Sequence, residues 1–289
     1  MTTPWLQLTV WLAVITLSPA HASADGPRTR QQNPVVVSGW QAYTHGDLLA
    51  ALSAYQQAVD ASPDDASLWY DLGCLHALHH DVTTARDALH HALTLNPQLA
   101  AAHDALGQLS EQAGDVVDAR AHYTRATDLA PTNVKFLQHL SRVQLQSPDL
   151  TEARATLLRL LGFDPKNVEA RYALGVLELR ANAPDLALHH FRQALEHAPG
   201  DVRAWNGLGL AYARIGEFEE AVNVLEHAQA LAPQNVQTLT NLGVVAATQA
   251  HWSEARRAWQ SSLELEPHFT PAVENLERLN TLTTPASSR

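Results

Sequence analysis

Seven prolines follow one another along this chain at a constant interval of 34 residues: Pro63, Pro97, Pro131, Pro165, Pro199, Pro233 and Pro267. A fixed period of this length indicates one supersecondary unit that has been copied without insertion, and such units stack into a solenoid. The spacing therefore predicts seven repeats over residues 32–269. Their boundaries are 32–65, 66–99, 100–133, 134–167, 168–201, 202–235 and 236–269.

Each repeat has the pattern of two helices joined by a short turn. The twentieth place is alanine in every copy, and apolar residues recur at helical spacing on both sides of a polar break such as Gly216. The eighth place holds Gly39, Gly73, Gly107, Ser141, Gly175, Gly209 and Gly243. The twenty-fourth place holds Tyr55, Leu89, Tyr123, Leu157, Phe191, Leu225 and Trp259. A small residue that faces a bulky one lets two helices pack closely, and each proline then ends the second helix, so we predict an all-α fold.

On these residues the chain resembles the tetratricopeptide repeat family. The sixth repeat matches the family signature best, through Trp205, Leu208, Gly209, Tyr212, Ala221, Leu225, Ala228 and Pro233. The resemblance implies a right-handed superhelix of about seven helix-turn-helix repeats that presents a binding surface. Two copies depart from the pattern. The β-branched run from Val35 to Val37 predicts a frayed or extended start, and Ser141, Pro148 and Leu160 predict irregular stacking in the fourth repeat.

Both ends of the chain differ from the repeats. Residues 1–24 resemble a secretory signal peptide, with an apolar stretch too short for a stable membrane span, and residues 25–31 form a linker. This arrangement predicts export, to the bacterial periplasm; the alternative is an uncleaved segment that holds the protein at the membrane. Thr270 and Pro271 predict the start of a capping helix over residues 270–280, followed by a disordered tail over 281–289.

The charge of the chain restricts its partners. The formal net charge of −11 argues against nucleic acid, because phosphate binding requires a basic surface. The fourth repeat is the exception, with five Lys or Arg against three Asp or Glu. We expect this repeat to be an electropositive region within an acidic array.

The resemblance also implies which residues meet a partner. In the family, the first helices line a concave groove through the second, fifth, ninth, twelfth and thirteenth places of each repeat. The predicted partner-binding residues are Trp40, Tyr43, Tyr70, Lys135, Arg142, Tyr172, Arg180, Arg203, Asn206 and Arg214. These basic and aromatic side chains fit an acidic or C-terminal peptide segment. The alternative is that the arginines are solvated charges paired with neighbours such as Glu169.

Cysteine and histidine are the residue types of this chain that could act as reactive or metal-binding groups. We expect the single cysteine, Cys74, to be a buried apolar residue; a reactive thiol or an intermolecular disulfide is the alternative. His76 and His80 have a spacing that can present two imidazoles to a metal ion, although the place of His76 favours packing. His122 and His190 are expected to face outward from their second helices. We predict no cofactor and no metal site.

These observations favour a binding protein over an enzyme. No nucleophile elbow, phosphate-binding glycine loop or carboxylate pair stands outside the repeat register. We therefore expect a non-enzymatic scaffold or adaptor of the cell envelope that holds another envelope protein in its groove. Similar exported repeat proteins assist the assembly of pili, secretion machinery, polysaccharide exporters or cytochrome-maturation complexes. The alternatives are a self-assembling, homo-oligomeric coat and a histidine-based metal-binding protein.

Overall fold

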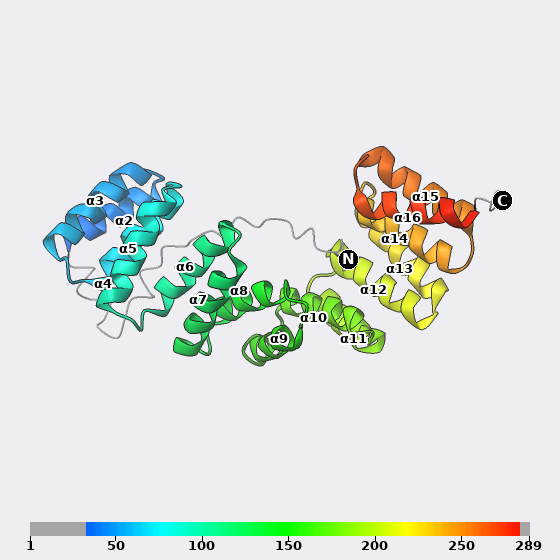
Figure 1. Ribbon diagram of the computed structural model, residues 1–289, viewed down its shortest axis with the longest axis horizontal. Coiled ribbons are helices and arrows are strands. Elements are labelled where there is room, and N and C mark those ends of the chain that lie inside the picture. Colours follow the sequence, from blue (N-terminus) through cyan, green and yellow to red (C-terminus); the bar gives the residue numbers. More distant parts are fainter. Residues whose placement is uncertain (1–32, 284–289) are drawn as a thin grey trace, which may run out of the picture. The chain divides into compact units, whose positions relative to one another are not determined.

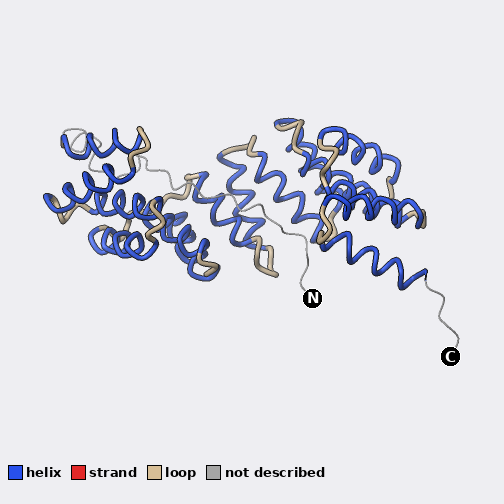
Figure 2. The backbone as a smooth tube through the Cα atoms, turned by 90° about the horizontal axis from the view of Figure 1, so that it is seen from above, coloured by secondary structure: helices blue, strands red, loops and turns tan. Residues whose placement is uncertain are grey.

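A computed structural model of the chain describes residues 33–283. The predicted signal peptide and linker, and the part of the predicted tail from residue 284 onward, lie outside the described residues. Within 33–283 there are helices and connecting turns and no strand (Figure 2). The prediction of an all-α fold is confirmed.

The described residues divide into two compact units, residues 33–163 and residues 164–283. The helices of the first unit are α2 (Pro34–Thr44), α3 (Leu48–Ala61), α4 (Ala66–Leu78), α5 (Val82–Leu95), α6 (Ala100–Gln112), α7 (Val116–Leu129), α8 (Val134–Gln144) and α9 (Thr151–Phe163). Those of the second unit are α10 (Val168–Arg180), α11 (Pro184–His197), α12 (Val202–Ile215), α13 (Phe218–Leu231), α14 (Val236–Thr248), α15 (Trp252–Leu265) and α16 (Thr270–Thr283). Figure 1 labels them in chain order. Each repeat therefore supplies one pair of helices, as the 34-residue period predicts.

Polar side chains cap the starts of most first helices. Asn133 and Asn167 each accept a hydrogen bond from a backbone N–H in the first turn of α8 and α10. The same contact is present at α2, the first of the described helices, where the side chain of Asn33 accepts a hydrogen bond of 3.0 Å from the Val35 N–H. The expectation of a frayed or extended start was therefore wrong. Asn33 as N-cap and Pro34 in the first turn outweigh the weak helix propensity of three successive valines.

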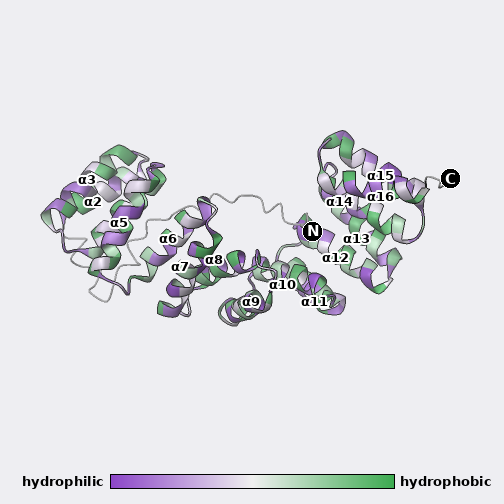
Figure 3. Cartoon of the chain, in the orientation of Figure 1, coloured by the Kyte–Doolittle hydropathy of each residue, from purple (hydrophilic) through white to green (hydrophobic). Residues whose placement is uncertain are grey.

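The small residue at the eighth place does face the bulky residue at the twenty-fourth. A Cβ added to Gly175 would lie 2.6 Å from the ring of Phe191, and one added to Gly73 would lie 2.8 Å from Leu89. Such distances leave no space for a side chain, so glycine sets the separation of the two helices. The bulky partners are buried in the core of each unit, and Figure 3 shows that every helix carries both hydrophobic and hydrophilic residues.

The fourth repeat departs from the others, as expected from its sequence. Its first helix, α8, has 11 residues, as does α2 of the first repeat, whereas the corresponding helices of the second, third and fifth repeats have 13. Ser141 replaces the usual glycine and is buried, with its hydroxyl donating to the Gln138 carbonyl at 2.9 Å. The boundary between the two units falls at the end of this repeat.

The last helix, α16, packs on α15 and α14 and covers the end of the second unit. It begins at Thr270, as predicted, and continues to Thr283, three residues beyond the predicted end. Its buried residues Ala272 and Leu279 belong to one cluster with Trp259 of α15. Of the helices within residues 33–283, none is long and apolar enough to cross a membrane.

Candidate partner-binding face

The residues expected to meet a partner lie on the first helices of the repeats. In the first unit these helices are α2, α4, α6 and α8, and in the second unit they are α10, α12 and α14. First helices of successive repeats touch one another, since α4 packs on α6 and α10 packs on α12. We call the residues at the second, fifth, ninth, twelfth and thirteenth places of each repeat the inner-face residues, and we describe them separately in each unit.

The inner-face residues at the start of the first unit are aromatic. The rings of Trp40 and Tyr43 lie 5.5 Å apart, and both side chains are half-buried. Tyr70 on α4 is 8% exposed and is hydrogen-bonded to the buried thiol of Cys74. Burial, with Asp71 nearby, raises the pKa of the Cys74 thiol well above its ordinary value, so this group stays protonated. Cys74 is thus the buried residue that the sequence predicted, and its protonated state does not favour the reactive-thiol alternative.

A buried polar cluster connects α6 and α8. Nδ1 of His139 lies 2.7 Å from Oδ1 of Asp104, and the Gln108 side-chain amide donates to the other oxygen of Asp104 at 2.8 Å. All three residues are less than a tenth exposed. The ring of Tyr123, on α7, lies 5.3 Å from the ring of His139. These contacts hold two successive first helices in one arrangement.

Arg142 belongs to the same surface and is paired. It donates to Glu111 at 2.6 Å, and the Tyr123 hydroxyl donates to the same carboxylate oxygen at 2.8 Å. Burial by itself would lower the pKa of the Arg142 guanidinium, but the hydrogen bond and the charge of Glu111 outweigh it, and the pKa is raised. Arg142 therefore carries a permanent charge whose first partner is within the chain.

In the second unit Arg203 is the most extensively bonded residue of the predicted set. Its guanidinium donates to both oxygens of Glu169, each at 2.8 Å, and also to Asp201 at 2.9 Å. The guanidinium carbon lies 4.9 Å from the ring centroid of Tyr172. For Arg203, the structure thus shows the alternative of a charge paired with Glu169.

Asn206 joins an amide network between α12 and α14. Its side chain donates to the Thr238 hydroxyl at 2.9 Å and accepts from the Asn241 amide at 3.2 Å. Gln237 in turn donates to Asn241 at 2.9 Å. Asn206 and Asn241 are buried, so they fix the spacing of the helices and present little surface to a partner.

The remaining predicted cations are more accessible. Lys135 on α8 is half-buried, and Arg180 and Arg214, near the ends of α10 and α12, are exposed. The side chain of Arg214 forms no hydrogen bond or ion pair with another of the residues 33–283. It is the inner-face arginine of the second unit that is most directly available to an external carboxylate.

Two expectations about histidine were wrong. His190 is 9% exposed, and the side chain of His122 is 17% exposed, so neither faces outward into solvent. Nδ1 of His122 lies 3.1 Å from Nδ1 of His103, and burial lowers the pKa of both imidazoles. Among residues 33–283, no group of three or more His, Cys, Asp or Glu side chains is placed to hold a metal ion.

Sequence reasoning missed the contacts made by histidine. His139 and His103 occupy places outside the predicted inner-face set, and no local pattern marks them as partners of Asp104 and His122. A signal was present in the spacing, because His139 and Asp104 stand 35 residues apart, one repeat plus one residue. Polar residues at that separation on first helices are candidates for contact between repeats.

Comparisons with known proteins agree with this architecture. Two family models described as "Tetratricopeptide repeat" match, one over residues 37–100, 70–134 and 172–236 and the other over residues 111–177. A search of curated proteins found no match.

Solved structures share the fold at low sequence identity. A tetratricopeptide repeat protein from Parabacteroides merdae is 16% identical, with a TM-score of 0.60 over 85% of this chain and 97% of that one. A chain of the APC/C hetero-tetramer Cut9–Hcn1 is 19% identical, with a TM-score of 0.61. The match covers 87% of this chain and 50% of the Cut9–Hcn1 chain, so this chain spans about half the length of that one. YrrB, described as a TPR protein with an unusual peptide-binding site, is 20% identical, with a TM-score of 0.53 over 66% of this chain and 99% of that one.

Proposed function

Because the chain belongs to the tetratricopeptide repeat family, we propose that it is a non-enzymatic scaffold or adaptor that binds a segment of another protein on its inner-face residues. The observation that carries this proposal is the set of side-chain bonds between successive first helices. Glu169 to Arg203 in one unit and Glu111 to Arg142 in the other both span neighbouring repeats. Such bonds order the surface before a partner arrives, which reduces the entropy lost on binding.

The chemistry of the inner face favours an acidic segment or a C-terminal carboxylate. Arg180 and Arg214 supply exposed positive charge in the second unit, and the half-buried side chains of Lys135 and Arg142 add positive charge in the first. Trp40 and Tyr43 offer half-buried aromatic surface against which a side chain of the partner can pack. YrrB, which shares the fold, is described as having a peptide-binding site, and this supports a peptide segment as the ligand.

The cell envelope is the proposed location, and assembly of a multiprotein complex is the proposed role. The support is the apolar stretch from Leu6 to Leu17, followed by small residues suited to cleavage after Ala24. The partner is accordingly another envelope protein. Expression with the native N-terminus, followed by fractionation and N-terminal sequencing, tests this part. A mature chain beginning at Asp25 in the envelope supports export, and a full-length chain in the cytosol contradicts it.

Arg214 is the best residue with which to test the inner face. Replacing Arg142 by glutamate would place a second carboxylate beside Glu111, and replacing Arg203 by glutamate would place one beside Glu169. Loss of binding in either variant could therefore reflect loss of structure. Arg214→Glu breaks no bond with residues 33–283, and Arg257→Glu on the second helix α15 is a matched control with the same change in charge. Arg257 is exposed and lies outside the inner-face set.

The experiment is a crosslinked capture from an envelope extract, with the chain from Asp25 onward as bait. We expect a partner that is captured by the native chain and by Arg257→Glu but lost with Arg214→Glu, while circular dichroism shows equal helix content. Equal capture by all three baits would contradict the inner-face assignment. Capture of its own copies alone would favour the self-assembling coat.

A further inference from the structure

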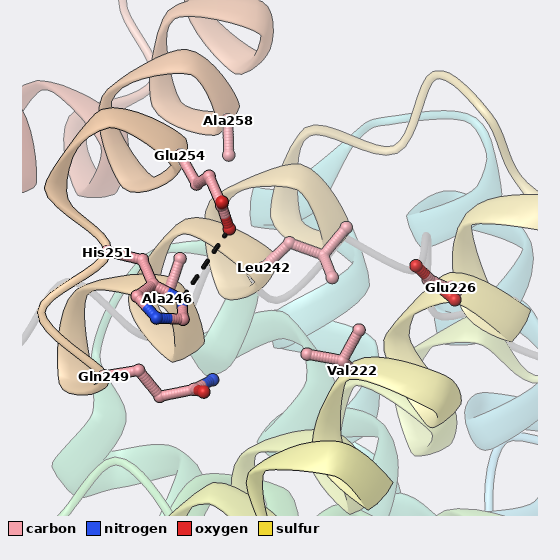
Figure 4. Close-up of a pocket in the computed structure, with 8 residues that line it drawn as sticks. All are labelled: Val222, Glu226, Leu242, Ala246, Gln249, His251, Glu254 and Ala258. Atoms are coloured by element: carbon pink, nitrogen blue, oxygen red, sulfur yellow. Dashed lines mark ion pairs between the residues drawn. The ribbon is translucent and has the colours of Figure 1, made fainter.

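A cavity of about 360 Å³ lies between the sixth and seventh repeats, within the second unit. Figure 4 shows the side chains that line it, which include Val222 and Glu226 on α13 and Glu254 on α15. The other lining residues are Leu242, Ala246, Gln249, His251 and Ala258. Two carboxylates and no lysine or arginine line this space. None of the lining residues belongs to the inner-face set.

Elsewhere in the chain the same junction between repeats contains an arginine. Between the second and third repeats, Arg86 lies 3.7 Å from the Asp118 carboxylate, 32 residues later. Ser110, which precedes Asp118 by eight residues, donates to that carboxylate at 2.5 Å and accepts from Arg86 at 3.4 Å. The cation, the carboxylate and the polar side chain form one cluster on three helices.

The next junction repeats this arrangement. Arg120 lies 3.8 Å from the Glu152 carboxylate, again 32 residues later. Gln144, eight residues before Glu152, donates to it at 3.5 Å. Two successive junctions therefore place an arginine at the twenty-first place of one repeat beside a carboxylate at the nineteenth place of the next.

At the junction between the sixth and seventh repeats, which contains the cavity, the carboxylate at the nineteenth place is present, but the arginine and the polar side chain that accompany it elsewhere are absent. Glu254 occupies the place of Asp118 and Glu152, but Val222 stands in the place of the arginine and Ala246 in the place of the polar side chain. The ion pair that remains to Glu254 among the described residues is with His251, at 3.8 Å, and both side chains are more than half exposed. Val222 and Ala246, which line the cavity, have shorter side chains than their register equivalents Arg120 and Gln144.

At a third junction, the arginine comes from the twenty-fifth place of its repeat and not from the twenty-first. Between the fifth and sixth repeats, Arg192 donates to the Tyr212 hydroxyl at 2.7 Å and lies 5.6 Å from the centroid of its ring. Tyr212 is the register equivalent of Ala246, and Arg192 is the register equivalent of Glu226. At the junction between the sixth and seventh repeats, Ala246 therefore stands in place of the tyrosine and Glu226 in place of the arginine.

We propose that this cavity binds the guanidinium group of an arginine side chain on a partner protein. The ligand class follows from complementarity, because at three other junctions the chain fills the equivalent region with its own arginine. A guanidinium can form two parallel hydrogen bonds to the Glu254 carboxylate, while its aliphatic stem packs against Val222 and Leu242. The site is separate from the inner-face residues and does not depend on the function proposed for them.

The test uses the chain from Asp25 onward and a pair of small probes. N-acetyl-arginine N-methylamide carries the guanidinium, and the citrulline analogue has a neutral group of nearly the same shape. Binding is followed by amide chemical shifts in the second unit. We expect the arginine probe to shift residues around Glu254 and Val222 and the citrulline probe to cause much smaller shifts.

Three variants locate the site. Glu254→Gln should weaken binding of the arginine probe by about 2- to 5-fold, the range expected for a partly exposed ion pair. Val222→Arg should abolish binding, because the new side chain reaches Glu254 as Arg120 reaches Glu152. Glu219→Gln is the control, since Glu219 is an exposed residue of α13 outside the lining, and it should leave affinity unchanged.

Equal binding of the two probes would overturn the proposal, as would unchanged affinity in Glu254→Gln. Glu254 is exposed, so its substitution leaves the fold intact and the result interpretable even if Val222→Arg fails to fold. Arg214→Glu should have no effect on the arginine probe. That result separates failure of this site from failure of the inner-face proposal.

Discussion

Arg203 and Glu169 stand at the second place of successive repeats, 34 residues apart, and join through two hydrogen bonds of 2.8 Å each. The hydrogen bonds that Arg203 donates to Glu169 and to Asp201 raise the pKa of its guanidinium further above its already high value. The pair is nevertheless open to solvent, with side-chain exposures of 43% and 55%. Its geometry therefore contributes more to the order of the inner face than to stability.

Arg203→Ala and Arg142→Ala should differ in their effect on stability. We expect Arg203→Ala to lower the free energy of unfolding by about 0.5–1 kcal/mol, because solvent replaces an exposed partner. Arg142→Ala should cost about 2 kcal/mol, since Glu111 is only 20% exposed and would lose its cation. Urea denaturation of the full chain measures both losses in the free energy of unfolding. Hydrogen exchange of backbone amides in each unit assigns each loss to its unit. A larger loss of free energy of unfolding for Arg203→Ala than for Arg142→Ala would contradict the assignment of Arg142 and Glu111 as the more buried pair.

Gly175→Ala should be strongly destabilising. The added methyl group would lie 2.6 Å from Cε1 of Phe191, so α10 and α11 would have to separate, at a cost of about 2 kcal/mol. Gly162→Ala is the matched control, because its Cβ would meet nothing within 4 Å, and its effect should be neutral or stabilising by up to about 1 kcal/mol, since alanine is the better helix former. Thermal unfolding compares the two. A similar melting temperature for both variants would show that the helices can separate without loss.

The first unit should lose stability as the pH falls below the ordinary histidine pKa of 6.5. Burial is the main cause of the lowered pKa of His103 and His122, and the second imidazole adds to the effect at His103, whereas Asp118 opposes it at His122. A lowered pKa in the folded state means that the neutral forms contribute stability above 6.5. This contribution is lost as the pH falls through the folded-state values.

His122→Gln tests this explanation. Melting temperatures between about pH 7.5 and 5 should fall less steeply in the variant than in the native chain. His90, Arg86 and Arg125 also face this pair, so the native chain already disfavours added positive charge there. Parallel curves for the two proteins would mean that other groups set the pH dependence. His268→Gln, an exposed substitution, serves as the control.

Ala250→Gly should stabilise the second unit. Ala250 has φ of 61°, and its register equivalents Gly46, Gly114 and Gly216 also have positive φ. A left-handed conformation costs a residue with a Cβ about 1–2 kcal/mol, which outweighs the added entropy of glycine in the unfolded chain. We expect a gain of about 0.5–1 kcal/mol, measured by thermal unfolding. A lower melting temperature would show that Ala250 makes contacts worth more than the strain.

The sequence by itself determined the repeat architecture. The 34-residue interval, the small residue opposite a bulky one and the proline after each second helix are backbone and packing requirements, and they recur in register. The helix start at Asn33 and Pro34 was missed, because the weak helix propensity of the following valines suggested a frayed start. Local rules suffice here because each helix pair packs mainly on itself and on its neighbours.

Only the tertiary structure decided which polar groups meet. Arg203 could have remained free, yet its two terminal guanidinium nitrogens both donate to Glu169 of the preceding repeat. His122 was expected in solvent and instead contacts His103, and the cavity beside Glu254 appears only when Val222 is placed opposite it. These outcomes depend on rotamers and on the distance between helices of different repeats. A linear pattern gives the identity and register of a side chain, but the space around it is set by neighbours 19 to 35 residues away.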